Sequence, residues 1–255
     1  MLSGRTKYSN GRGEPNLLEA LASKYSKRST NNISPKNFLC LPGTQTALYA
    51  TMMTLVEESD GVLVGDPYYA TYEGIIRSSG AEIQPVPLLQ KFGFSIQEQD
   101  IRKQITPSSK ILLLNSPHNP TGAILSLDNY LALIELCRKH GIYMLHDEIF
   151  NGLGKLSTEH LPFVADIYER GLSLNVMSKS YGLPGLRIGW IACKDAMVIS
   201  QMERVKHYLS ICNSGPSEHL ALIALRNKEK IFKRNCALID SNLKKWDAFF
   251  SRHTD

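Results

Sequence analysis

Short apolar runs alternate along the chain with longer segments in which apolar residues recur every three or four positions. The short runs, which predict β-strands, are residues 37–41, 62–64, 82–87, 110–115 and 142–146. The longer segments predict helices that begin at Pro15 and Thr44, that cover residues 97–105 and 127–140, and that place Val198, Met202, Val205 and Leu209 on one face. Strands that alternate with helices and are almost continuously apolar are typical of a parallel sheet covered on both faces. The predicted fold class is therefore α/β, with three α/β/α layers and a mostly parallel sheet.

The two ends of the chain depart from this alternation. The first 14 residues are polar and rich in glycine, which predicts an arm or loop. Near the other end, a three- and four-residue apolar spacing runs through Phe232, Cys236, Ile239, Leu243, Trp246 and Phe250. This spacing predicts one amphipathic helix that continues to the end of the sequence. Such a helix normally packs on another element, which we expect to lie outside this sequence.

Polar or glycine-rich segments follow four of the predicted strands. They are residues 43–46, Tyr68 with Tyr69, Asn119, and Asp147. In sheets of this class, ligands bind outside the carboxyl ends of the strands. Four separate segments that converge on one edge support a ligand site there more strongly than any one of them does.

Gly43, Thr44 and Gln45 open a helix directly after a strand. Backbone N–H groups at a helix start, helped by a threonine hydroxyl, can bind a phosphate. An ordinary strand-to-helix turn explains the same residues equally well. The G-x-x-x-x-G-K-[ST] pattern of a P-loop does not occur in the sequence.

Asp147 follows a strand that we expect to be buried, and a buried carboxylate needs a polar partner. The partner is a helix start, an arginine, or the protonated ring nitrogen of a ligand, which would form a charge-assisted hydrogen bond. The neighbouring His146 and Glu148 superficially resemble the other members of a metal triad. However, successive side chains of a strand point to opposite faces of the sheet, so we predict no metal site.

Lys179 lies in a segment of small residues, between Ser178 and Ser180 and close to Gly182. Loop lysines are mostly solvated, and that is the commoner interpretation of this one. The alternative is a lysine at the floor of a pocket, where desolvation favours the neutral, nucleophilic amine.

The composition narrows the class of protein. The 255 residues are 43% hydrophobic and 21% charged, which is typical of one large globular domain. The net charge of +5 is modest and dispersed, so nucleic acid is not expected as a partner. No apolar run is long enough to predict a membrane span. The five cysteines form no C-x-x-C pair, which favours free thiols in a reducing compartment, the cytoplasm. The G-x-S-x-G motif of many hydrolases does not occur either.

A lysine, a carboxylate for a ring nitrogen, an aromatic side chain and a phosphate-binding turn together indicate pyridoxal phosphate as the cofactor. Over nearly its whole length the chain resembles the class I and II aminotransferases, the fold-type I pyridoxal-phosphate enzymes. The most specific segments are residues 115–122, with the sequence NSPHNPTG, and residues 178–190, from Ser178-Lys179 to Gly189-Trp190. They lie in the expected order around residues 146–149.

The resemblance implies a role for each candidate residue. Lys179 forms the Schiff base and moves a proton between the substrate Cα and C4′ of the cofactor. Asp147 keeps the pyridine nitrogen protonated, Asn119 hydrogen-bonds the phenolic oxygen, and Tyr69 stacks on the ring. The phosphate is held by Gly43, Thr44, Gln45 and Arg187, with Ser178 close by. Tyr8 reaches the phosphate in the partner subunit, which implies a homodimer with shared active sites.

The sequence departs from the family pattern at three places. Phe150 stands where a tyrosine is usual, so either a hydroxyl is missing from the phenolic oxygen and Asn119 makes that contact alone, or the position tolerates either residue. Val176 stands where many members have a phosphate-binding serine, so the phosphate is bound more weakly, or Ser178 or Ser180 compensates. No arginine precedes Asn213 at a place suited to a second substrate carboxylate, which leaves a dicarboxylic substrate unsupported.

The resemblance also implies a domain organisation. Residues 1–230 would be the pyridoxal-phosphate-binding large domain, with residues 1–14 as its arm. Residues 231–255 would be a connecting helix toward a small domain that this chain lacks and that carries the arginine for the substrate α-carboxylate. The expected activity is transfer of an amino group between an amino acid and a 2-oxo acid. The alternatives are another reaction of the same cofactor, such as elimination, decarboxylation or cyclisation, and a cofactor-binding domain or fragment without activity.

Overall fold

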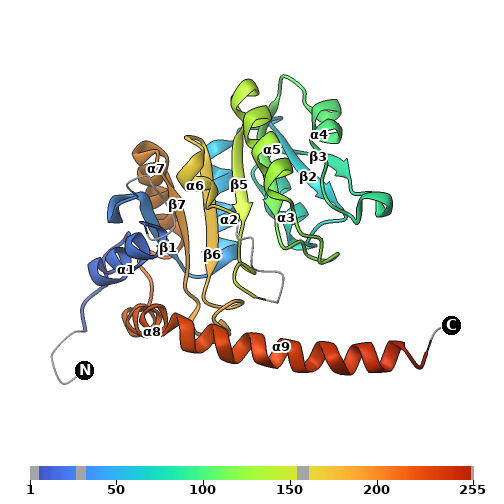
Figure 1. Cartoon of the computed structure of the whole chain (residues 1–255). Helices are drawn as coiled ribbons and strands as arrows, with labels where there is room; N and C mark the ends of the chain where they lie inside the picture. The colour runs from blue at the N-terminus through green and yellow to red at the C-terminus, as the bar shows by residue number, and fades with distance from the viewer. Residues whose placement is uncertain (1–5, 27–32, 154–160, 254–255) are drawn as a thin grey trace.

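A seven-stranded sheet forms the centre of the computed structural model, which describes residues 6–26, 33–153 and 161–253 (Figure 1). The order of its strands is β1-β7-β6-β5-β4-β2-β3. Their bounds are β1 (Phe38–Leu41), β2 (Gly61–Asp66), β3 (Glu82–Pro87), β4 (Ser109–Asn115), β5 (Tyr143–Asp147), β6 (Gly171–Val176) and β7 (Gly189–Cys193). Only β7 is antiparallel to its neighbours, and the other pairings in the described sheet are parallel. The predicted class, α/β with a mostly parallel sheet, is confirmed.

Helices cover both faces of the sheet because alternate residues of each strand are apolar on opposite faces. In β5, for example, Leu145 packs in one core cluster and Met144 in another. The cluster around Leu145 includes side chains of α2 (Thr44–Leu55), α3 (Thr71–Ser78) and α7 (Ala196–Leu209). The opposite face is covered by α1 (Pro15–Ser26), α4 (Glu98–Gln104), α5 (Leu127–His140), α6 (Val164–Ile167) and α8 (Gly215–Arg226). Short 3-10 helices lie at Pro35–Asn37, Gln90–Phe92 and Pro184–Leu186.

The last helix, α9 (Lys228–Phe250), differs from the others. All of its residues are described, and none of them is buried. It extends from α8 past the sheet toward the C-terminus (Figure 1). Contacts with the remainder of the molecule are near its first turns, where the Nδ2 of Asn235 donates to the carbonyl oxygen of Ser180 at 3.0 Å. The apolar spacing therefore predicted the helix, and the structure leaves its later apolar positions exposed, among them Leu243, Trp246 and Phe250.

Besides the short 3-10 helices, β6, β7, α6 and α8 were not among the predicted elements. β6 contains Ser173 and Asn175 at buried positions, and these polar residues interrupt the apolar run by which a buried strand is found. α8 begins at Gly215 and Pro216, residues that on their own are typical of a turn. Proline is tolerated in the first turn of a helix, so this turn is also the start of a helix.

Candidate active site

The predicted site residues other than Tyr8 gather at one edge of the sheet. Gly43, Tyr69, Asn119, Asp147 and Lys179 lie at or after the carboxyl ends of β1, β2, β4, β5 and β6. Arg187 lies just before the antiparallel strand β7, whose start is at the same edge. The parallel connections thus bring residues that are far apart in sequence to one place.

Asp147 is the deepest of these residues, with 2% of its surface exposed. Its Oδ2 accepts a hydrogen bond from the hydroxyl of Tyr72 at 2.6 Å, and its Oδ1 accepts one from the N–H of Ile149 at 3.4 Å. Burial raises the pKa of the Asp147 carboxyl to about 6, against the hydrogen bond from Tyr72, which lowers it. Asp147 therefore neither pairs with an arginine nor bonds to a helix start, which were two of the three kinds of partner expected for it.

Tyr72 belongs to the site although the sequence analysis did not select it. Burial and the negative charge of Asp147 raise the pKa of its hydroxyl well above the usual value, so the hydroxyl stays protonated and donates. Its ring meets that of Tyr69 edge to face, with the centroids 5.6 Å apart. The spacing of three residues at the start of α3 was the available signal, because such residues lie on one side of a helix.

Asn115 connects the turn after β4 to the end of β5. Its Oδ1 accepts from the N–H of Asn119 at 2.7 Å, and its Nδ2 donates to the carbonyl oxygen of Asp147 at 3.0 Å. The backbone of Asn119 is thereby fixed relative to Asp147. Gln45, at the start of α2, donates from Nε2 to the hydroxyl of Thr71 at 2.9 Å and connects the starts of α2 and α3.

Gly43 and Arg187 form a cradle at the N-terminus of α2. A Cβ on Gly43 would lie 2.4 Å from Nη2 of Arg187, and the φ of Gly43 is 98°. The backbone conformation therefore favours glycine, and a side chain at this position would displace the Arg187 guanidinium. An exposed guanidinium beside the N-terminus of a helix suits an anion. The hydroxyl oxygen of Ser178 is buried and has no hydrogen-bond partner among the described residues, so it is free to bind a further oxygen.

Lys179 is exposed, which agrees with the solvated interpretation of this loop lysine and not with the desolvated alternative. The next residue explains this orientation, since the buried hydroxyl of Ser180 donates to the carbonyl oxygens of Ile149 and Asn151 at 2.8 and 2.9 Å. With Ser180 turned inward, Lys179 points outward. Its Nζ lies 5.9 Å from the centroid of the Phe150 ring, so the lysine and the aromatic residue that follows Asp147 are neighbours.

Comparison with known families settles which class of protein has this arrangement. The family model described as "Aminotransferase class I and II" matches residues 1–245. The chain belongs to this family.

Two named aminotransferases are among the proteins similar to this chain. The arginine–pyruvate transaminase AruH of Pseudomonas aeruginosa is 37% identical over 195 residues, which cover 75% of this chain and 49% of that protein. A probable aspartate/prephenate aminotransferase of Aquifex aeolicus is 32% identical over 238 residues, which cover 90% of this chain and 59% of that protein. The chain thus spans about half to three fifths of the length of these relatives.

Solved structures show the same architecture. The N-succinyldiaminopimelate aminotransferase of Mycobacterium tuberculosis superposes with a TM-score of 0.91 at 27% identity, covering 98% of this chain and 66% of that one. The aspartate aminotransferase of Thermus thermophilus with maleate superposes with a TM-score of 0.87 at 29% identity, covering 92% of this chain and 62% of that one. The resemblance to the fold-type I aminotransferases is confirmed.

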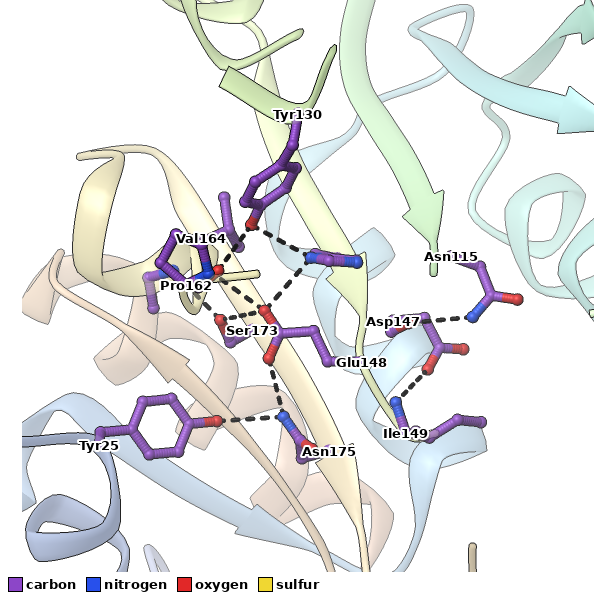
Figure 2. Close-up of polar contacts among 12 residues, drawn as sticks. Tyr25, Asn115, Tyr130, Asp147, Glu148, Ile149, Pro162, Val164, Ser173 and Asn175 are labelled. Atoms are coloured by element: carbon purple, nitrogen blue, oxygen red, sulfur yellow. Dashed lines mark hydrogen bonds and ion pairs between the residues drawn. The ribbon is translucent and has the colours of Figure 1, made fainter. Parts of the chain in front are cut away.

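This aminotransferase-family chain also has a buried polar network directly behind the site, which the sequence analysis missed (Figure 2). Glu148 is 1% exposed, and its Oε1 accepts from the hydroxyl of Ser173 at 2.9 Å and from the N–H of Val164 at 3.2 Å. Its Oε2 accepts from Nδ2 of Asn175 at 2.9 Å. The Nδ1 of His146 lies 3.3 Å from Oε1. Glu148 therefore connects β5, which carries Asp147, to β6, which leads to Lys179.

His146 contacts Glu148 and Tyr130 of α5, whereas Asp147 bonds to Tyr72 of α3 on the other face of the sheet, as the alternation of side chains along a strand requires. Within the described residues, no group of three or more histidine, cysteine or acidic side chains is placed to hold a metal ion. The helices of the described segments also include none that is long and apolar enough to cross a membrane.

Tyr8 is the one predicted site residue that does not lie at the edge of the sheet where the others gather. It lies in the arm before α1, and 83% of its surface is exposed. Its neighbour Ser9 lies against the start of α8, since a Cβ on Gly215 would be 2.9 Å from the Ser9 hydroxyl oxygen. Tyr8 is therefore exposed beside a residue that contacts its own chain.

Proposed function

We propose that this chain is the cofactor-binding part of a pyridoxal-phosphate-dependent aminotransferase that moves an amino group between an amino acid and a 2-oxo acid. The observation that carries the proposal is the buried Asp147 carboxylate, held by Tyr72 at the edge where Lys179 and the Gly43–Arg187 cradle also lie. A pyridine nitrogen, an aldehyde and a phosphate need those three kinds of group. Membership of the class I and II aminotransferases supports the same cofactor.

The residues present fit this cofactor. The dianionic phosphate matches the exposed Arg187 guanidinium, the N-terminus of α2 with Thr44 and Gln45, and the unpartnered hydroxyl of Ser178. Val176 is 3% exposed at the end of β6 and offers no hydroxyl, so we assign to Ser178 the contact that a serine at position 176 would make. When bound, the cofactor supplies an electron-withdrawing ring that stabilises negative charge at the substrate Cα.

The side chains of this chain then hold and move protons. Asp147, kept in place by Tyr72, accepts a charge-assisted hydrogen bond from the pyridine N–H. Lys179 provides the amine that attaches the cofactor and afterwards takes the proton from the substrate Cα. Tyr69 stacks on the ring, and Asn119 donates to the phenolic oxygen. Phe150 offers no hydroxyl to that oxygen, so Asn119 makes the contact alone.

The assembly we propose is a homodimer with shared active sites, in which Tyr8 of the partner subunit contacts the phosphate. The exposure of Tyr8 supports this arrangement. The five cysteines, all free in the structure, support a reducing compartment, the cytoplasm.

The test is a titration of the purified chain with pyridoxal phosphate, followed by borohydride reduction and peptide mapping. The proposal expects an absorbance change that saturates at one cofactor per chain and a reduced label on Lys179. Lys179→Ala should abolish the label, whereas Lys230→Ala, on α9, should leave it unchanged. A label spread over surface lysines would contradict the proposal.

A second step separates transamination from the other reactions of this cofactor. With an amino acid added alone, an aminotransferase stops after one equivalent per site, and a 2-oxo acid restores turnover. Continued turnover without a 2-oxo acid would favour a lyase or cyclase.

A further inference from the structure

Two fully buried side chains of opposite charge bind the backbone of the arm that carries Tyr8. Lys206, in the last turn of α7, and Glu218, in the first turn of α8, are each 0% exposed. The Nζ of Lys206 donates to the carbonyl oxygen of Gly11, and Oε2 of Glu218 accepts from the N–H of Glu14 at 2.7 Å. Lysine and glutamate are almost never buried so completely unless they are paired. Here both side chains bond to an irregular stretch of backbone.

Further contacts hold the same stretch. The Nε and Nη2 of Arg12 donate to Oε2 of Glu203 on α7, at 2.9 and 2.5 Å. The N–H of Cys40, in β1, donates to the carbonyl oxygen of Arg12 at 2.8 Å. A Cβ on Gly11 would come within 2.6 Å of Nε2 of His207. The backbone from Gly11 to Glu14 is thus held by bonds to α7, α8 and β1, although it forms no helix or strand.

The connection between α7 and α8 is part of the same cluster. The Oε1 of Glu218 accepts from Nδ2 of Asn213 at 2.6 Å. Burial lowers the pKa of Lys206 and raises that of Glu218, and the charge of each opposes the shift of the other. Burying two charges is costly unless both are well hydrogen-bonded, and here both bond to the backbone of the arm.

The arm becomes exposed at Tyr8, directly before this fixed stretch. Two residues separate Tyr8 from Gly11, and 83% of the surface of Tyr8 is exposed. We infer that Arg12, Glu203, Lys206 and Glu218, hereafter the arm anchor, are positioning residues that present Tyr8 of one subunit to the phosphate site of the other. This inference rests on the proposed function, which places Tyr8 of the partner subunit at the cofactor phosphate. It assigns to one subunit the groups that set cofactor affinity in its partner.

Hybrid dimers test the inference. One subunit carries Lys179→Ala, so the dimer has a single lysine-bearing site, and the arm that reaches this site belongs to the Lys179→Ala subunit. Glu218→Gln or Glu203→Gln is then placed in one subunit or in the other. Two affinity tags isolate the hybrid, and the dissociation constant of pyridoxal phosphate is measured from the label that borohydride fixes on Lys179.

The anchor variant should weaken cofactor binding by about tenfold when it lies in the Lys179→Ala subunit, the effect of losing one hydrogen bond to a charged group. In the lysine-bearing subunit it should change binding by less than about twofold, because that subunit's own arm serves the other site. A merely structural role would give the opposite order or equal effects, and either result would overturn the inference. Tyr8→Phe should show the same dependence on subunit as the anchor variants.

Two variants protect the test against misfolding. Glu203 is partly exposed in its pair with Arg12, with 21% side-chain exposure, so Glu203→Gln leaves no buried charge without a partner. Glu135→Gln, on the surface of α5 with 70% side-chain exposure, is the matched control and should have no effect in either subunit.

The oligomeric state separates failure of this inference from failure of the proposed function. If the wild-type chain sediments as a monomer while the label still forms on Lys179, the inference falls together with the proposed homodimer, and the proposed cofactor chemistry stands. If no label forms on Lys179 in the wild-type chain, both fall.

Discussion

Asp147 and Glu148 are adjacent, equally buried carboxylates whose surroundings differ sharply. Glu148 is bound by the hydroxyl of Ser173, the N–H of Val164 and the amide of Asn175, with His146 close by. Asp147 has one short hydrogen bond, from Tyr72, and one long one, from the backbone of Ile149. A carboxylate whose acceptor sites are filled by the protein stabilises the fold, whereas one with acceptor capacity left over at a strand end is available to a ligand.

The largest expected effect breaks this contrast at Asp147. Asp147→Asn removes the charge that faces the ring nitrogen, and turnover should fall by about 100- to 1,000-fold, the usual cost of removing a preorganised electrostatic group. The free energy of unfolding should not fall, because the variant no longer buries a charge. Steady-state rates and thermal unfolding measure the two quantities. Turnover within tenfold of wild type would contradict the role.

The pH dependence of stability is the next effect in size. In the chain without cofactor, the pKa of Asp147 is raised to about 6 from 3.8, so the folded state binds a proton that the unfolded state has already released. Stability from this group is fully present below pH ~4 and is lost as the pH rises through ~6, by up to about 3 kcal/mol. Chemical unfolding at pH 4 and 7.5 should show this loss in wild type and a smaller one in Asp147→Asn. Equal slopes in the two proteins would contradict it.

Glu148→Gln tests the other carboxylate, whose acceptor sites are filled by the protein. The new amide NH2 would face groups that donate to Glu148 and would leave buried donors without acceptors. We therefore expect the free energy of unfolding to fall by about 2 kcal/mol. Cofactor affinity should change by less than about threefold, because Glu148 lies on the opposite face of the sheet. Denaturant unfolding and cofactor titration give both values, with Glu135→Gln as the exposed control. A large loss of affinity with unchanged stability would reverse the assignment of the two carboxylates.

Tyr72→Phe should have the smallest of these effects, and it tests the single short hydrogen bond to Asp147. It takes away the short hydrogen bond and leaves Asp147 with even fewer donors, so the pKa of Asp147 should rise further and the cofactor should bind about five- to tenfold more weakly. Spectroscopic titration of pyridoxal phosphate checks this change. Tyr208→Phe, at a side chain that is 94% exposed, should leave the affinity unaltered.

The sequence allowed prediction of those parts of the site that follow from local pattern. Apolar runs located β4 and β5, and therefore the segments after them that carry Asn119 and Asp147. Lys179 and Arg187 were identified from the family resemblance of a short segment. The sequence left the burial of Lys179 open, because it depends on Ser180 bonding to the backbone of residues 149 and 151.

What the sequence could not give depends on partners that are distant along the chain. Ser173 and Asn175 make β6 look too polar for a buried strand, and only the position of Glu148 explains their burial. Lys206 and Glu218 resemble ordinary surface residues of two helices until the arm is placed between them. No short window of sequence contains these pairs, since the members of each pair lie 25 to 204 positions apart.

The exposed course of α9 has a mechanical consequence. Asn235, near its start, bonds to the carbonyl oxygen of Ser180, next to Lys179, and Phe250, at its end, lies about 22 Å further along the axis at 1.5 Å per residue. A rigid rod that is fixed near one end acts as a lever. A tilt of α9 displaces its far end much more than its near end, and a large movement at Phe250 is converted into a small, forceful one at the turn that carries the lysine.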